Sequence, residues 1–135
     1  MIRILFGIFV VLHGLVHLLY FGQSARFFEM QPGMVWPDGS WLFSKLVGDV
    51  TARTLANGSL ILAAIGLVVG GAGMIFKQAW SHPILTGAAI FSTLIYIIFW
   101  NGKMQNLDTQ GGIGILINLA ILASLYSVLR SYLKI

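Results

Sequence analysis

The sequence predicts an all-α membrane protein: a four-transmembrane-helix antiparallel bundle with one longer extramembrane loop between helices 1 and 2. Of its 135 residues, 58% are hydrophobic and only 9% are charged, whereas about a quarter of the residues in a soluble domain are charged. The mean hydropathy is +0.90. Four stretches without Asp, Glu, Lys or Arg approach or exceed the roughly 20 residues that cross a bilayer as helix. They cover residues 4–25, 54–76, 78–102 and 109–129.

The first helix and the loop are predicted from the N-terminal third of the chain. We expect a helix over residues 2–22 and a loop over 23–49, because this segment holds two of the three prolines and three of the four acidic residues. Within the loop, Asp38 or Ser40 can cap a short interfacial helix that begins near Trp41.

The remaining helices are predicted over residues 51–76, 83–101 and 111–133, in a single membrane domain covering 1–135. Pro83 opens the third helix, where proline suits the first turn. Small residues recur at helical spacing on three of the helices, and such faces allow close helix packing in lipid. They are Gly7 and Gly14 in the first helix; Ser59, Ala63, Gly66, Gly70 and Gly73 in the second; and Ala120, Ser124, Ser127 and Ser131 in the fourth.

Charge gives a prediction for orientation. An even number of helices puts Arg3, Lys77, Arg130 and Lys134 on the side of both termini, and Arg26, Lys45, Arg53 and Lys103 on the other side. Because three of the latter fall in or beside the longer loop segment, we expect cytoplasmic termini, in a prokaryotic cytoplasmic membrane. The net charge of +4 is spread without a basic block, so nucleic-acid binding has no support.

Polar residues recur at membrane depth on several predicted helices. His13 and His17 lie one turn apart, about 6 Å along the axis, and Asn118 falls at the level of His13. We predict a ligand pocket in the half of the bundle nearer the loop, since polar groups at this depth are functional candidates by default. Its predicted lining is His17, Arg53, Asn57 and Tyr96, with His13 and Asn118 at the floor and Trp36 and Trp41 in the loop above.

Structural interpretations compete with this pocket. Asp49 and Arg53 are spaced for an ion pair within one helix, and neutral imidazoles can donate to backbone carbonyls or to Asn118. Tryptophans near a membrane boundary often serve only as interfacial anchors. His13 and His17 can also bind a metal or each ligate a haem, but the chain has no Cys, and a complete metal site needs a third ligand.

The first helix carries Arg3, Gly7 and Gly14 in an R-x3-G-x6-G arrangement. With this arrangement and its size, the chain resembles the DoxX-like group of small four-helix membrane proteins. The resemblance implies a place in membrane complexes or in quinone-coupled oxidation, with a quinone headgroup near His17 and Arg53.

No nucleophile elbow, phosphate-binding glycine loop or paired catalytic carboxylate occurs in the sequence. We therefore expect a non-catalytic protein in the lipid bilayer, either an accessory subunit or an amphipathic-ligand-binding bundle of a larger membrane complex. One alternative is a quinone-linked oxidoreductase component that uses His13 or His17 together with Arg53. A second alternative is a minimal dimeric transporter. The expected partners, besides the lipid bilayer, are a second copy of the chain or other membrane subunits.

Overall fold

The computed structural model of the protein describes residues 1–133 and is helical, with no strand among them. Lys134, which contributed to the predicted charge distribution, lies outside the described residues. The elements are α1 (Ile2–Ser24), α2 (Phe43–Val47), α3 (Asp49–Ile75), α4 (Ser81–Phe99), η1 (Met104–Asn106), η2 (Asp108–Gly112) and α5 (Ile113–Leu133). Within residues 1–133, four helices are long and apolar enough to cross a membrane. The predicted four-helix membrane fold is thus confirmed.

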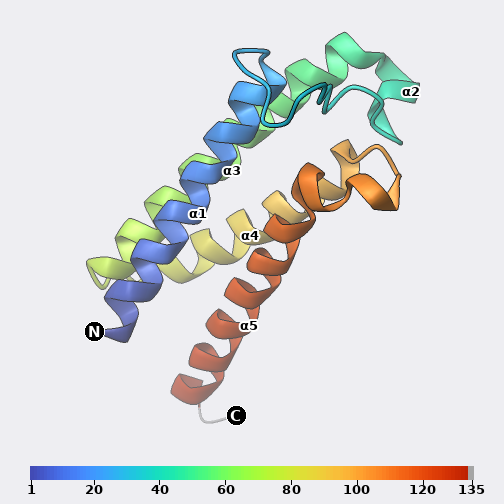
Figure 1. Cartoon of the computed structure of the whole chain (residues 1–135). Helices are drawn as coiled ribbons and strands as arrows, with labels where there is room; N and C mark the ends of the chain where they lie inside the picture. The colour runs from blue at the N-terminus through green and yellow to red at the C-terminus, as the bar shows by residue number, and fades with distance from the viewer. Residues whose placement is uncertain (134–135) are drawn as a thin grey trace.

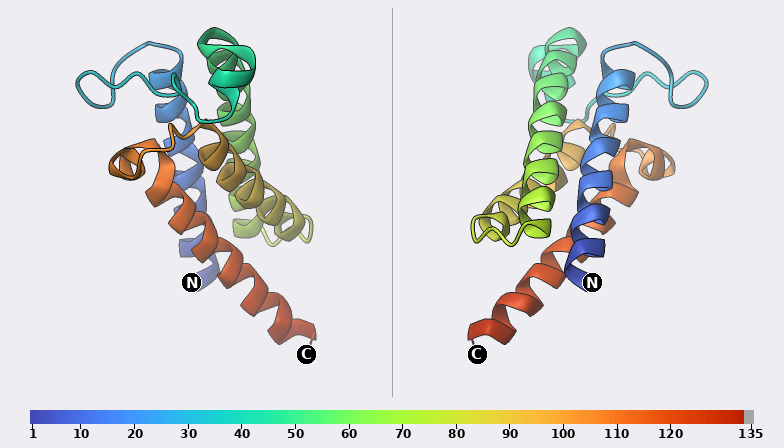
Figure 2. Two further views of the ribbon diagram at one scale, coloured as in Figure 1. Left: turned by 90° about the vertical axis from the view of Figure 1, so that its right-hand side faces the viewer. Right: turned by 90° about the vertical axis from the view of Figure 1, so that its left-hand side faces the viewer.

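The helices run alternately up and down, so that α1 and α3 lie side by side with opposite directions (Figures 1 and 2). Both chain ends lie at one end of the bundle, and the 25–42 loop with α2 lies at the other (Figure 1). Aliphatic side chains point outward along all four long helices, in keeping with contact to lipid chains.

Glycines mark the closest helix contacts. A Cβ added at Gly14 of α1 would meet Leu67 of α3 at 3.0 Å, and one added at Gly71 of α3 would meet the Gly7 carbonyl oxygen at 2.9 Å. On another face of α3, a Cβ at Gly66 would lie 2.9 Å from Ala88 of α4. The small-residue faces predicted for the first and second helices therefore pack against neighbouring helices.

The small-residue face predicted for α5 does not pack inside the bundle. Ala120, Ser124 and Ser127 are exposed, and the two serine hydroxyls donate to carbonyl oxygens four residues earlier in their own helix. The buried face of α5 is instead formed by Asn118, Ile121 and Leu125. Within one chain, residues 1–133 do not make the close packing expected at this face, because the side of α5 that carries Asn118, Ile121 and Leu125 is the one turned toward the other helices.

The loop is tied to the end of α4. Ser40 Oγ accepts a hydrogen bond from the backbone N–H of Phe43, the first residue of α2, which supports the predicted capping role of Ser40. The same hydroxyl donates to the carbonyl oxygen of Ile98 at 2.7 Å. Trp41 Nε1–H donates to the carbonyl oxygen of Ile97 at 2.7 Å. The loop thereby covers the C-terminal end of α4.

The last helix begins later than predicted, because a kinked turn precedes it. Gly111 has φ of +105° within η2, a conformation that side-chain-bearing residues rarely adopt. A Cβ at this position would overlap the ring of Tyr96, and one at Gly114 would lie 2.8 Å from the same ring. The two glycines therefore form the surface against which Tyr96 packs.

Candidate functional site

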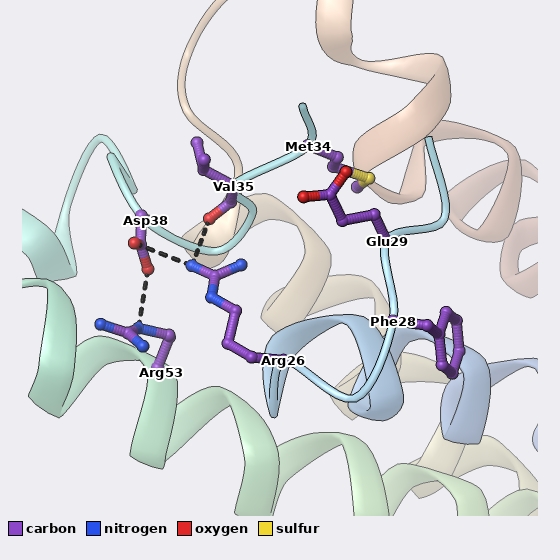
Figure 3. A pocket seen from close by; sticks show the side chains of 7 residues that line it. All are labelled: Arg26, Phe28, Glu29, Met34, Val35, Asp38 and Arg53. Atoms are coloured by element: carbon purple, nitrogen blue, oxygen red, sulfur yellow. Dashed lines mark hydrogen bonds and ion pairs between the residues drawn. The ribbon is translucent and has the colours of Figure 1, made fainter. Parts of the chain in front are cut away.

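A cavity of about 410 Å³ lies between the loop and the ends of α1 and α3. Its lining residues, which define the loop pocket, are Arg26, Phe28, Glu29, Met34, Val35, Asp38 and Arg53 (Figure 3). Three of the seven side chains are apolar and four are charged. The loop pocket therefore combines a hydrophobic lining with charges of both signs, at the end of the bundle where a membrane boundary is expected.

Two arginines share one carboxylate in the loop pocket. Arg26 Nη2 lies 2.8 Å from Asp38 Oδ2, and Arg53 Nε lies 2.9 Å from Asp38 Oδ1 (Figure 3). Within residues 1–133, the terminal nitrogens of Arg53 have no hydrogen-bond partner, and its contact through Nε is an ion pair rather than an aligned hydrogen bond. One carboxylate against two guanidinium groups leaves a positive wall with donors to spare.

Arg26 is held firmly although its backbone is unfavourable. Its φ is +65°, a region that non-glycine residues rarely occupy and that costs on the order of 1 kcal/mol or more. Nη1 donates to the carbonyl oxygen of Trp36 at 3.2 Å, and Nη2 donates to that of Val35 at 2.8 Å. These hydrogen bonds and the Asp38 contact fix the loop over the end of α1.

Gln23, at the end of α1, is fully buried and holds the loop from below. Its Nε2 donates to the carbonyl oxygen of Met34 at 3.0 Å, and its Oε1 accepts from the N–H of Met30 at 2.7 Å. Because a buried amide must satisfy its hydrogen-bonding groups, this side chain selects one loop conformation.

A second polar feature, the polar ring, is a closed circuit of hydrogen bonds among His13, His17, Ser92 and Asn118. His13 Nε2 lies 2.8 Å from Asn118 Oδ1, and Asn118 Nδ2 donates to Ser92 Oγ at 2.7 Å. Ser92 Oγ lies 2.6 Å from His17 Nε2, while His17 Nδ1 lies 3.0 Å from the His13 carbonyl oxygen. All four residues are at most 5% exposed.

When both imidazoles are neutral, every hydrogen bond of the polar ring can be assigned one donor and one acceptor without conflict. A carbonyl oxygen only accepts, so His17 Nδ1 carries the proton and His17 Nε2 accepts from the hydroxyl of Ser92. Ser92 in turn accepts from the Asn118 amide, and His13 Nε2–H donates to Asn118 Oδ1. The circuit links α1, α4 and α5, and it engages three of the four imidazole nitrogens. It is the arrangement expected of interhelical hydrogen bonding.

Aromatic rings connect the loop with the polar ring. The ring centroids of Trp36 and Tyr20 are 5.4 Å apart, those of Tyr20 and Tyr96 are 5.2 Å apart, and those of Tyr96 and His17 are 5.3 Å apart. The Tyr20 hydroxyl donates to the carbonyl oxygen of Thr109 at 3.3 Å. The Tyr96 hydroxyl is buried and has no partner in the part of the chain that the structure describes.

No family model, curated protein or solved structure matches this chain. The resemblance to the DoxX-like group therefore stays an expectation that rests on Arg3, Gly7 and Gly14. What the chain itself shows is an integral membrane protein with four apolar helices, a loop pocket and a separate polar ring.

The predicted pocket residues fall into these two places. His13, His17, Asn118 and Tyr96 lie together, and the hydrogen bond from His13 confirms that Asn118 shares its depth. Arg53 instead lines the loop pocket, and its ion pair is with Asp38 rather than with Asp49, whose Oδ1 accepts from the N–H of Gly39. The expectation of one pocket joining Arg53 to His17, and that of an ion pair with Asp49, are corrected accordingly.

The predicted lining also included Trp36, Trp41 and Asn57. Trp36 is buried and packs on Tyr20, whereas Trp41 is exposed and bonds to the backbone of α4. Asn57 has a buried Oδ1 that no described residue bonds. For metal binding, the described residues contain no group of three or more His, Cys, Asp or Glu side chains suitably placed. Metal or haem ligation by His13 and His17 stays a prediction without a third protein ligand.

Sequence reasoning missed two kinds of residue. Tyr20 lies three residues after His17 and seven after His13, so extending the helical spacing by one step places it on the same face. The loop residues Phe28 and Glu29 carried no such signal, because the course of an irregular loop has no period to read.

Proposed function

We propose that this membrane protein binds a small amphipathic ligand in the loop pocket, as an accessory component of the membrane rather than as an enzyme. The observation that carries the proposal is Arg53, which lines the loop pocket together with three apolar side chains and the charged Arg26, Asp38 and Glu29, and which makes only one ion pair, through Nε, within residues 1–133. An arginine with unpaired donors binds phosphate or carboxylate groups well. The apolar lining suits the hydrophobic part of the same ligand.

The polar ring supports a structural role for the histidines. Its hydrogen bonds are made within the protein, so ligand binding there would first require breaking them. The outward-facing residues Ala120 and Ser124 on α5 favour association with a second copy or with other membrane subunits, as small faces do in lipid.

Amphiphile binding is tested by native mass spectrometry of the protein released from nanodiscs. We expect the wild type to retain bound amphiphile and Arg53→Gln to lose most of it, because the substitution removes the unpaired guanidinium donors. Lys45→Gln is the matched control, since Lys45 is an exposed cation on α2 outside the loop pocket. Equal retention by all three proteins would contradict the proposal.

Quinone-linked redox chemistry is a second candidate, and a different observation favours it. A second cavity, of about 230 Å³, is lined by Tyr20, whose ring leads through Tyr96 to His17. A quinone headgroup in this cavity would lie at the start of that series. This candidate predicts that lipid extracts of the purified wild-type protein contain a quinone and that extracts of Tyr20→Ala do not. Absence of quinone from the wild-type extracts would count against this candidate. Transport by a dimer stays a prediction without a supporting observation.

A further inference from the structure

We propose that the ligand of the loop pocket is a zwitterionic phospholipid whose headgroup carries a primary ammonium, that is, a phosphatidylethanolamine-type lipid. This inference rests on the proposed function and names the class of ligand. The positive wall would hold the phosphate, Glu29 would hold the ammonium, and the acyl chains would leave the pocket toward the lipid around the helices.

The charges of the loop pocket are divided between two sides. Arg26 and Arg53 both contact Asp38, and the carboxylate of Glu29 lies apart from this cluster (Figure 3). With Asp38 neutralising one arginine, the first side carries a net charge of +1 and the second a charge of −1. A ligand with one negative and one positive group complements this arrangement, whereas a purely anionic ligand would leave Glu29 opposed.

Glu29 retains accepting capacity for an ammonium. Its Oε2 accepts one hydrogen bond, from the N–H of Gly33 at 2.9 Å, and the structure of residues 1–133 gives no partner to Oε1. A primary ammonium has three N–H donors and pairs with a carboxylate through short hydrogen bonds. A trimethylammonium has no N–H to donate, so the carboxylate distinguishes the two headgroups.

The dimensions and position favour a membrane lipid over a free solute. The volume of about 410 Å³ is at the lower end of the range for small-ligand sites, which suits a headgroup rather than an entire lipid. Val35, which lines the pocket, and Phe27, which precedes the lining residue Phe28 in the sequence, are strongly exposed apolar side chains. Exposed apolar side chains of this kind would contact the acyl chains where these leave the pocket.

The test compares lipids that differ only in the headgroup. Wild-type protein is reconstituted into nanodiscs with equal amounts of phosphatidylethanolamine, phosphatidylcholine and phosphatidylglycerol, and the bound lipids are counted by native mass spectrometry. We expect about a tenfold preference for the ethanolamine lipid, the ratio that one charge-assisted hydrogen bond supplies. In Glu29→Gln, which keeps the side-chain shape, the preference for ethanolamine over choline lipid should fall to near one. Soluble glycerophosphoethanolamine, added in excess, should compete only weakly.

The outcomes separate this inference from the proposed function. Equal retention of the three lipids, a preference for phosphatidylglycerol, or an ethanolamine preference unchanged in Glu29→Gln would each overturn the inference and leave amphiphile binding intact. Strong competition by the soluble headgroup compound would show that the ligand is a free phosphate ester. Retention of no lipid by the wild type would overturn both. The wild-type comparison among the three lipids tests the inference even if Glu29→Gln does not fold.

Discussion

Replacing Gly111 with alanine is expected to destabilise the protein by about 3 kcal/mol or more, the largest effect of any single substitution that we predict. Two costs combine at this position. The φ of +105° disfavours any residue with a Cβ, and the added methyl would overlap the ring of Tyr96. Because that ring is buried and packs on Tyr20 and His17, it has no free direction in which to move.

Gly87→Ala is the control for this substitution. Gly87 lies within α4, and a Cβ there would meet no atom within 4 Å. Alanine should be neutral or stabilise the helix by up to about 1 kcal/mol. The free energy of unfolding, measured by titration with sodium dodecyl sulfate in mixed micelles, compares the two variants. If Gly111→Ala were as stable as Gly87→Ala, the packing of Tyr96 described above would be wrong.

His17→Ala is expected to destabilise the protein by about 2 kcal/mol. The substitution removes the acceptor of the Ser92 hydroxyl proton and the side-chain donor to the His13 carbonyl oxygen, and a buried unsatisfied polar group costs about 1–3 kcal/mol. Interhelical hydrogen bonds in lipid average only about 0.6 kcal/mol each. We therefore expect a loss near the middle of the range of about 1–3 kcal/mol rather than a larger one. The same titration measures the loss.

His82→Ala provides the comparison. His82 lies in the first turn of α4, is partly exposed, and takes no part in the polar ring, so its loss should cost less than about 0.5 kcal/mol. Equal effects of the two substitutions would show that the polar ring adds no stability. A selective effect of His17→Ala on unfolding with unchanged lipid binding would separate the polar ring from the loop pocket.

The transmembrane helices are predictable from the sequence because lipid imposes a strong requirement. A chain in hydrocarbon must satisfy its backbone hydrogen bonds within helices, so the stretches without charge mark the spans directly. The rise per residue also predicts that His13 and Asn118 share a depth, and their side chains meet at 2.8 Å. Turn chemistry similarly predicts that Ser40 precedes α2.

The rotation of each helix is harder to predict. A helix that packs on protein with one side and on lipid with the other is apolar all round, so hydrophobicity does not mark the buried face. Small residues marked the face that packs within the chain for Gly66 on α3 but not for Ser124 on α5. The polar residue Asn118 was the better guide on α5, because burial in protein is what satisfies its hydrogen bonds.

The loop pocket was unpredictable for a different reason. Its lining joins Arg26 and Glu29 to Arg53, and only the folded course of the loop brings them together. From the sequence, either Asp38 or Asp49 could form the ion pair with Arg53. Which of them does so depends on where the folded loop places Asp38. Gln23 fixes the course of the loop through its hydrogen bonds to the backbone of Met30 and Met34.

Headgroup photolabelling tests most directly whether the loop pocket binds the amphiphile. The probe is a phosphatidylethanolamine-type lipid with a photoreactive diazirine beside the phosphate, crosslinked in nanodiscs and mapped by peptide mass spectrometry. We predict labelling concentrated on Phe28, Met34 and Val35, which line the pocket, and loss of that labelling when unlabelled lipid of the same headgroup is added. Labelling that is spread over the lipid-facing sides of the helices, with none in the loop, would contradict the account.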